Sequence, residues 1–211
     1  FTGTEWNFFT KHNTSNFGKL GDGGDFFGIC EDKYENMWFG TNGSNVKKFI
    51  RKENYWNRYH IGTKDNSTFR LLKHGEGSPW GKCDAIAQDS SGWLWFSSYK
   101  SNKGSIFCYN LEDEKPNSSS YRYFFPNGSK YHISVPLVIN IDAAGRIFVG
   151  GDKDAEGKLV IFNHDGDPIK NGIDTLYDGK FNKVWDMASV ANPADSRTWI
   201  VTEKGLYHYQ Y

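Results

Sequence analysis

The sequence lacks the features that mark membrane, secretory-leader and nucleic-acid-binding chains. No apolar run reaches about 18 residues, so no membrane-spanning helix is predicted. The chain starts at Phe1 without a basic segment and apolar core, so we expect that any targeting segment has been removed or that this is an excised piece. Lys plus Arg and Asp plus Glu each number 25, which gives a net charge of zero. A neutral chain suits neither nucleic acid nor an anionic membrane, and neither partner is expected.

The sequence also has few cysteines and no recognisable catalytic motif. Cys30, Cys83 and Cys108 form no C-x-x-C pair, which excludes a full disulfide framework and a cysteine zinc site. Cys30 and Cys108 lie in apolar runs and are expected to be free and buried, while one disulfide involving Cys83 stays open. No histidine pair has helical metal-ligand spacing, and no Gly-x-Ser-x-Gly or phosphate-binding glycine motif occurs. We predict no metal, no cofactor and no catalytic residue, and leave enzymatic activity open.

Aromatic residues and glycines are abundant, and they recur at intervals. Aromatics make up 17% of the chain and glycines number 23 against 2 methionines, a balance typical of sheets and turns. An apolar run ending in a polar turn is followed four times by a strand-like run with an aromatic residue. These aromatic anchors are Trp38, Trp95, Phe148 and Trp199, spaced by 57, 53 and 51 residues. A period near 50 residues indicates a repeat architecture.

Each repeat can be divided into strands by the alternation of its apolar and polar residues and by the turn residues that separate the runs. A first strand ends in aspartate, a turn follows with Asn36, Gly92 or Gly145, and a second strand carries the anchor. Third strands are expected at 46–50, 105–110, 158–163 and 205–209, and fourth strands at 55–60, 121–125 and, weakly, 168–170. Four antiparallel strands per unit predict an all-β fold, a β-propeller of four-stranded blades.

The arithmetic of the strands leaves two arrangements open. Residues 5–10 look like a fourth strand without a unit before it, and the last unit, at 180–211, lacks one. The first expectation is a single domain over 1–211, with blades near 20–60, 80–125, 133–170 and 180–211 closed by strand 4–10 into a small ring. Closure would remove exposed sheet edges. The second is a four-blade segment of a larger propeller.

One segment carries a competing signal. Phe181, Val184, Trp185 and Ala188 have the i, i+3, i+4, i+7 spacing of an amphipathic helix. The repeat register instead places a first strand at 184–190, and we expect the strand.

These units resemble the two-component regulator propeller repeat. The resemblance rests on Glu31-Asp32 with Met37-Trp38-Phe39-Gly40-Thr41, on Gln88-Asp89 with Leu94-Trp95-Phe96, and on Lys204-Gly205-Leu206-Tyr207. It covers nearly the whole chain and weakens from the first unit to the fourth. It implies a periplasmic, secreted or cell-surface sensor-type propeller, often one that recognises glycan fragments or belongs to a secretion complex. Members usually carry seven blades with a membrane helix and kinase, and this sequence shows neither.

Candidate ligand-binding residues lie in the loops that surround a propeller mouth, which join the fourth strand to the next first strand and the second strand to the third. Trp80, between Pro79 and Gly81, suits stacking on a sugar or peptide, with His74 and Glu76 beside it. The full predicted set is His74, Glu76, Trp80, Tyr99, Lys100, Tyr131, His132, Asp152, Tyr177 and Asp178. Packing of these aromatics against a neighbouring blade is the structural alternative.

The remaining acidic residues favour structural roles. Asp152-x-Asp154-x-Glu156-Gly157 resembles the start of a calcium loop but lacks the distal acid, and a solvated turn is the alternative. Asp32, Asp89 and Asp142 recur at one place in the repeat and are predicted to bond the turn. We expect a non-enzymatic extracytoplasmic recognition module for a glycan fragment or protein partner. The alternatives are a glycoside hydrolase or lyase, and a structural subunit of a bacterial surface complex.

Overall fold

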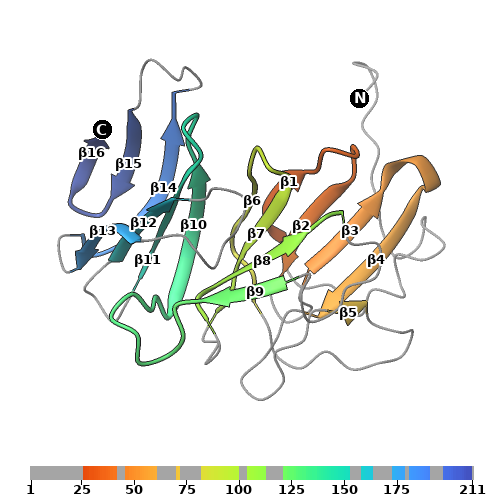
Figure 1. Ribbon diagram of the computed structural model, residues 1–211, viewed down its shortest axis with the longest axis horizontal. Coiled ribbons are helices and arrows are strands. Elements are labelled where there is room, and N and C mark those ends of the chain that lie inside the picture. The colour runs from red at the N-terminus through yellow and green to blue at the C-terminus, as the bar shows by residue number, and fades with distance from the viewer. Residues whose placement is uncertain are drawn as a thin grey trace.

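The chain forms four antiparallel sheets that follow one another in sequence and stand side by side in a row (Figure 1). We name them blades 1 to 4 in chain order. The computed structural model describes residues 26–41, 46–60, 70–71, 82–99, 104–112, 121–152, 158–163, 173–178, 181–190 and 197–210. In this part of the chain the regular structure is strand throughout, apart from one 3₁₀ turn.

Every blade is a meander in which each strand pairs with the next. Blade 1 contains β1 (Phe26–Glu31), β2 (Met37–Thr41), β3 (Val46–Ile50), the 3₁₀ turn η2 (Arg51–Glu53), β4 (Tyr55–His60) and β5 (Arg70–Leu71). Blade 2 contains β6 (Ile86–Gln88), β7 (Trp93–Ser97), β8 (Ile106–Asn110) and β9 (Tyr121–Phe124). Blade 3 contains β10 (Val135–Ile141), β11 (Arg146–Asp152), β12 (Lys158–Asn163) and β13 (Ile173–Asp178). Blade 4 contains β14 (Val184–Ser189), β15 (Thr198–Thr202) and β16 (Gly205–Tyr209).

The predicted turn aspartates have the structural role expected of them. Asp89 Oδ1 accepts the backbone amides of Ser91 and Trp93 at 2.9 and 3.0 Å, and its Oδ2 accepts the indole N–H of Trp95 at 2.7 Å. Asp32 bonds Trp38 Nε1 at the same distance. One buried carboxylate therefore closes the hairpin and satisfies the indole nitrogen of the anchor, which would otherwise be a buried donor without a partner.

In blade 3 different residues make the hydrogen bonds of the aspartate turn. Its anchor is Phe148, which has no ring N–H. Asp142 Oδ1 still accepts the amides of Ala144 and Arg146, but its Oδ2 accepts Arg146 Nε at 2.6 Å. The guanidinium is buried beside the carboxylate and replaces the indole N–H as the donor to this oxygen.

Neighbouring blades pack face to face, and the anchors lie between them. Trp38, Trp95 and Phe148 are almost completely buried. The three apolar clusters that hold them join blades 1 and 2, blades 2 and 3, and blades 3 and 4 respectively. In β7 every residue is buried because both faces are covered: Leu94 and Phe96 belong to the cluster with blade 1, whereas Trp93 and Trp95 belong to the cluster with blade 3.

Two equivalent glycines allow adjacent blades to approach closely. A Cβ on Gly40 would lie 2.2 Å from the carbonyl oxygen of Cys83, and one on Gly150 would lie 2.5 Å from Val184 Cγ1. Gly40 and Gly150 each stand two residues after their anchor, and Cys83 and Val184 precede the first strand of the next blade or begin it. Any side chain at these positions would push the blades apart.

The described strands do not close into a ring, since blade 4 and blade 1 lie at opposite ends of the row (Figure 1). The blade-like all-β architecture is confirmed, and blade 4 shows three strands. The strand proposed over 5–10 to complete it, like the fourth strand proposed over 168–170, lies outside the described residues. In blade 3 the fourth strand is β13, which begins at Ile173. Among the described residues, no helix is long and apolar enough to cross a membrane.

The competing helix at 181–188 does not form. Val184 to Ser189 is strand β14, as the repeat register predicts. The pairing of β14 with β15 shifts between Val184 and Asp186, which marks a bulge. The bulge places Val184 and Met187, three residues apart, on the same buried face, and this reproduces a helical spacing within a strand.

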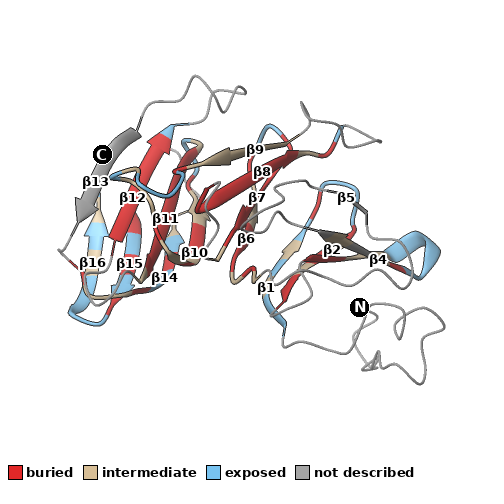
Figure 2. Cartoon of the chain, turned by 90° about the horizontal axis from the view of Figure 1, so that it is seen from below, coloured by how far each residue is buried: buried red, intermediate tan, exposed pale blue. Residues whose placement is uncertain are grey.

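Burial decreases toward both ends of the row. Figure 2 shows buried residues along β7, β8, β11 and β12, and exposed stretches in blades 1 and 4. All nine large hydrophobic side chains that are exposed in the described structure belong to these two outer blades: Phe26, Phe27, Ile29, Tyr34, Tyr55, Trp185, Trp199, Val201 and Leu206.

Candidate binding site at the mouth

A lysine and two aromatic rings meet where blade 1 contacts the start of blade 2. Lys82 Nζ lies 2.9 Å from Asp84 Oδ1, 4.7 Å from the ring centroid of Phe27 and 5.6 Å from that of Tyr99. Phe27 comes from β1, whereas Lys82 precedes β6 and Tyr99 follows β7. These are the loop ends that the sequence predicts to surround the mouth. We call these four residues the Lys82 cluster.

Asp84 is the least exposed polar group of this cluster. Its side chain is only 7% exposed, and within the described part of the chain its Oδ2 is buried without a hydrogen-bond partner. Its backbone is held in place, because Ser97 Oγ accepts the amides of both Asp84 and Ala85 at 2.8 and 2.9 Å. A fixed, desolvated carboxylate oxygen without a donor costs free energy, so Asp84 is the polar group of this cluster whose bonding is incomplete.

The repeat places a related cluster between blades 3 and 4. Lys183 Nζ lies 3.8 Å from Asp152 Oδ2 and 3.8 Å from the ring centroid of Trp185. Lys82 and Lys183 are equivalent, since each stands seven residues before the end of the apolar run, at Asp89 and Val190. Asp152 and Tyr99 are also equivalent, each four residues after its anchor. Two of the three junctions between blades thus combine a lysine, a carboxylate and an aromatic ring.

Tyr131 and His132 belong to a structural loop between blades 2 and 3. Tyr131 packs on Phe125, with 6.1 Å between ring centroids, and contacts the apolar cluster of these blades. The buried ammonium of Lys158 donates to the carbonyl oxygens of Lys130 and His132 at 2.7 and 3.1 Å. For Tyr131 the structure therefore supports packing at the rim, and no described contact joins this loop to the Lys82 cluster.

The other predicted site residues have different outcomes. His74, Glu76, Trp80 and Lys100 lie outside the described residues. Tyr177 and Asp178 were expected in a loop, but they are the last residues of β13, where their backbones pair with Leu159 and Lys158. Of the predicted set, Tyr99 belongs to the Lys82 cluster and Asp152 to its counterpart. Phe27, Lys82, Asp84, Lys183 and Trp185 were missed, although the equal offset of the two lysines was a signal.

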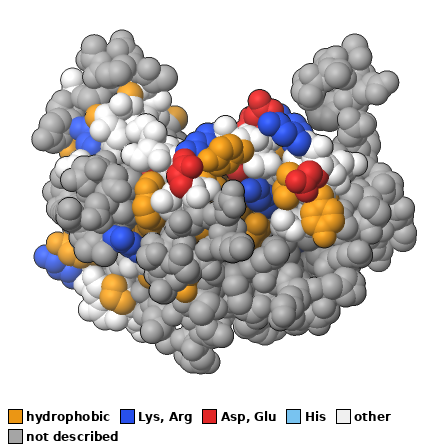
Figure 3. All heavy atoms as spheres, turned by 45° about the vertical axis from the view of Figure 1, so that its right-hand side comes forward, with side chains coloured by type: hydrophobic (Ala, Val, Ile, Leu, Met, Phe, Trp, Pro, Cys, Tyr) orange, Lys and Arg blue, Asp and Glu red, His pale blue; other side chains and the backbone are white. Residues whose placement is uncertain are grey.

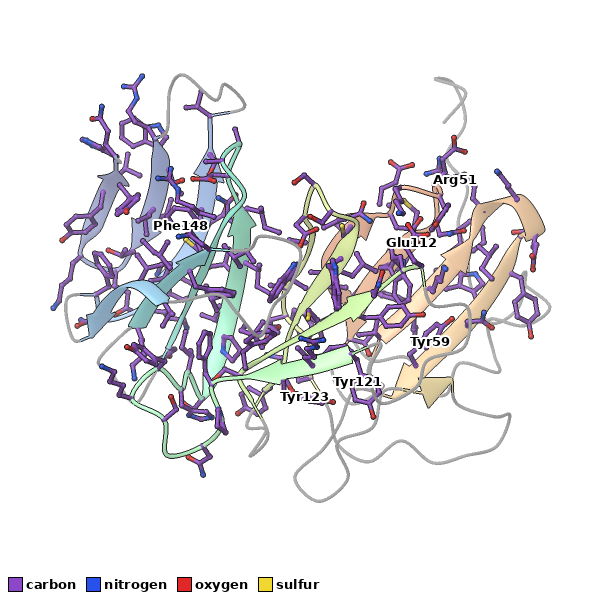
Figure 4. The ribbon with its side chains drawn as sticks, in the orientation of Figure 1. Arg51, Tyr59, Glu112, Tyr121, Tyr123 and Phe148 are labelled. Atoms are coloured by element: carbon purple, nitrogen blue, oxygen red, sulfur yellow. The ribbon has the colours of Figure 1, made fainter. Side chains whose placement is uncertain are left out.

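The opposite end of the blades carries a surface contact between blades 1 and 2. Glu112, which follows β8, bonds the ammonium of Lys33 and accepts the hydroxyl of Tyr34 at 3.0 Å. Figure 4 shows Glu112 at this end, and Tyr59 of β4 near Tyr121 and Tyr123 of β9 along the same junction. Burial raises the pKa of Tyr59, which packs on Trp38, so its phenol stays neutral. This end serves the packing of the two blades.

The cysteines are unsuited to catalysis or metal binding. All three are free. Burial raises the pKa of Cys30 to about 11 and that of Cys83 to about 12, and it also raises the pKa of Cys108. These thiols stay protonated at neutral pH, whereas nucleophiles and metal ligands act as thiolates. No group of three metal-ligating side chains occurs among the described residues.

Comparison with known proteins supports this architecture. The family model of the two component regulator propeller matches residues 20–43, which include β1 and β2. No curated protein sequence matches the chain.

Two solved structures are similar. PorZ, described as an essential bacterial surface component of the type-IX secretion system of Porphyromonas gingivalis, aligns over 93% of this chain with a TM-score of 0.56 and 16% identity. The extracellular domain of the putative one component system BT4673 from B. thetaiotaomicron aligns over 88%, with a TM-score of 0.29 and 12% identity. The chain spans 26% of the PorZ chain and 34% of the second. The likeness to PorZ shows a shared fold.

Proposed function

We propose that this chain is a non-enzymatic recognition module outside the cytoplasm, which binds a glycan fragment or a protein partner at the loop end of its blades. The family repeat supports a propeller used for sensing or surface assembly, and both similar structures are described as surface or extracellular proteins. The observation that carries the proposal is the buried, unbonded Oδ2 of Asp84, held beside a lysine and two aromatic rings.

A saccharide is the ligand class that this chemistry fits best. Its hydroxyls both donate and accept, so one can donate to Asp84 while its neighbour accepts from Lys82. Its C–H face can pack on the ring of Phe27, which is 41% exposed. Asp84 and Lys82 form an ion pair, so the cluster adds little net charge and favours a neutral sugar. A peptide that presents an amide N–H beside a carbonyl is the second ligand that fits.

The test is binding of the intact chain to an array of neutral and uronic-acid oligosaccharides, followed by titration calorimetry with the strongest binder. We expect Asp84→Asn and Phe27→Ala each to weaken binding at least about 10-fold, because one loses the acceptor and the other the apolar platform. Glu112→Gln, at the opposite end, is the control and should bind like the parent. Unchanged affinity in both mouth variants would place the ligand elsewhere, and an array without binders would favour a protein partner.

A further inference from the structure

The first strands of the four blades follow one another in direct contact. β1 contacts β6, β6 contacts β10, and β10 contacts β14, with Cα atoms that come within 8 Å of each other. Figure 1 shows these four strands in the same succession along the row. Residues that hold one position in each first strand therefore form a line that runs from blade 1 to blade 4.

One such position coincides with an irregularity in the pairing of the first strand with the second. In blade 3 the extra residue at this irregularity is Leu137, and in blade 4 it is Trp185. Both stand five residues before the end of the apolar run. In blade 1 the register shifts between Phe26 and Ile29, and the residue at the same position is Phe27. A bulge of this kind leaves its extra residue out of the ladder and changes the direction of the strand.

In blade 2 the same position is Asp84. The strand β6 begins only at Ile86, and the amides of Asp84 and Ala85 before it donate to Ser97 Oγ at 2.8 and 2.9 Å. A hydroxyl thus satisfies the backbone where the other blades have their bulge. We call the four residues at this position the track residues: Phe27, Asp84, Leu137 and Trp185.

The track residues lie outside the apolar packing between blades. None of them belongs to the three apolar clusters that the described residues form. Phe27 is 41% exposed although blade 2 follows it, and Leu137 is only half-buried although blade 3 has a neighbour on both faces. The accessibility of these two side chains therefore does not depend on where the row begins or ends. Bulges are frequent next to binding sites because they redirect a side chain.

The charged groups beside the track residues occur as pairs of opposite sign. Lys82 lies over Phe27 and bonds Asp84, and Lys183 lies over Trp185 and near Asp152. Figure 3, which turns the blade 1 side forward, shows apolar side chains next to side chains of both charges. Without a field of one sign, this surface suits a neutral ligand.

We propose that the track residues form a series of subsites, one in each blade, for an extended neutral oligosaccharide. This inference rests on the proposed function, which places a sugar at the Lys82 cluster. Successive sugar rings pack on Phe27, Leu137 and Trp185, and a hydroxyl donates to Asp84. Packed sheets stand about 10 Å apart, so the steps from blade 1 to blade 4 cover about 20 to 30 Å, more than a disaccharide can reach.

A comparison of ligand lengths tests this proposal. The probes are the disaccharide and the octasaccharide of the neutral glycan that binds most strongly on the array, titrated calorimetrically into the intact chain. We expect the octasaccharide to bind at least about 10-fold more tightly, because linked subsites act together. Leu137→Ala and Trp185→Ala should each weaken octasaccharide binding at least about 5-fold and leave disaccharide binding unchanged, whereas Phe27→Ala should weaken both.

Leu206→Ala and Tyr55→Ala are the matched controls. Each removes an exposed apolar side chain from a third or fourth strand, away from the track, and should bind both probes like the parent. Circular dichroism melts verify folding, and Leu137→Thr and Trp185→His replace any alanine variant that fails to fold.

Equal affinity for the two probes overturns the proposal, as does parental octasaccharide binding by either Leu137→Ala or Trp185→Ala. If Phe27→Ala and Asp84→Asn still weaken binding in that case, the proposed function stands and only the track is lost. If no saccharide binds, or if none of the four track variants weakens binding, the proposed saccharide site and the track both fail.

Discussion

Blades 2 and 3 differ from blades 1 and 4 in how deeply equivalent residues are buried. Trp95 in blade 2 is fully buried between two sheets, whereas Trp199 in blade 4 is 38% exposed. Ile86 in blade 2 is buried against Trp38, whereas its equivalent Ile29 is exposed. The sequence motif is the same, but among the described strands blades 2 and 3 have a neighbouring blade on both faces, whereas blades 1 and 4 have one on a single face. The contribution of a residue in these blades to stability thus depends on its place in the row as much as on its type.

Truncation of the two equivalent tryptophans should show the largest difference. Trp95→Ala removes a fully buried ring and its bond to Asp89, and should lower the free energy of unfolding by about 3–5 kcal/mol. Trp199→Ala removes a half-exposed ring and should cost less than about 1 kcal/mol. Urea denaturation of dilute protein measures both. Equal losses would show that position in the row does not matter.

The turn aspartate should give the next largest effect. In Asp89→Asn the amide oxygen can still accept from Ser91 and Trp93, but the NH₂ group then faces the indole N–H of Trp95, which is also a donor. We expect a loss of about 2 kcal/mol, measured in the same way. Asp186→Asn, on an exposed part of β14, should change stability by less than about 0.5 kcal/mol. If Asp89→Asn left the free energy of unfolding unchanged, the hydrogen bond to the indole would contribute no net stability.

The buried thiols predict a loss of stability at alkaline pH. The ordinary thiol pKa is 9.0, and burial raises it to about 11 for Cys30 and about 12 for Cys83. Above pH 9 the unfolded chain loses protons that the folded chain keeps, so stability falls as pH rises, by about 1.4 kcal/mol per pH unit for each thiol. Below pH 9 both states are protonated and the thiols add no slope. Denaturation from pH 8 to about 10.5 should show a shallower fall in Cys83→Ala than in the parent. Identical slopes would contradict the burial of this thiol.

The surface contact between blades 1 and 2 should matter least. The hydrogen bond from Lys33 to Glu112 raises the pKa of Lys33 and lowers that of Glu112, but both side chains are solvated. We expect Glu112→Gln to leave the unfolding midpoint unchanged while lowering the pKa of Lys33, followed by NMR titration. Arg146→Gln, which breaks the buried pair with Asp142, should lower the midpoint clearly. A similar midpoint in both variants would remove the distinction between exposed and buried pairs.

The strands next to the aspartate turn could be predicted from sequence, and the fourth strands less well. Asp32, Asp89 and Asp142 mark the turn because a bent backbone with two amides to satisfy requires a short acceptor there. The fourth strand has no such marker, and in blade 3 it begins at Ile173, beyond the expected 168–170. The helical spacing near Val184 was misleading because a bulge changes which residues are buried.

The candidate site was only partly predictable, because some of its residues meet through contacts between blades. Tyr99 follows β7 and Asp152 is the last residue of β11, and both are second strands whose ends the repeat marks. Phe27 reaches Lys82 from a different blade, and contact between blades depends on packing that no local pattern records. The unbonded oxygen of Asp84 is a property of the folded surroundings and has no signature in the sequence.

The bond between the turn aspartate and the anchor indole spans only six residues, from Asp32 to Trp38 and from Asp89 to Trp95. The hydrogen bonds of such a hairpin are made within the hairpin itself. Its contacts with other segments are mainly apolar packing. A gene segment that encodes such a hairpin can therefore be copied in tandem without rewriting the rest, and Arg146 shows that even the donor can later be exchanged. Modular growth of this kind needs only that each new copy stack on the last.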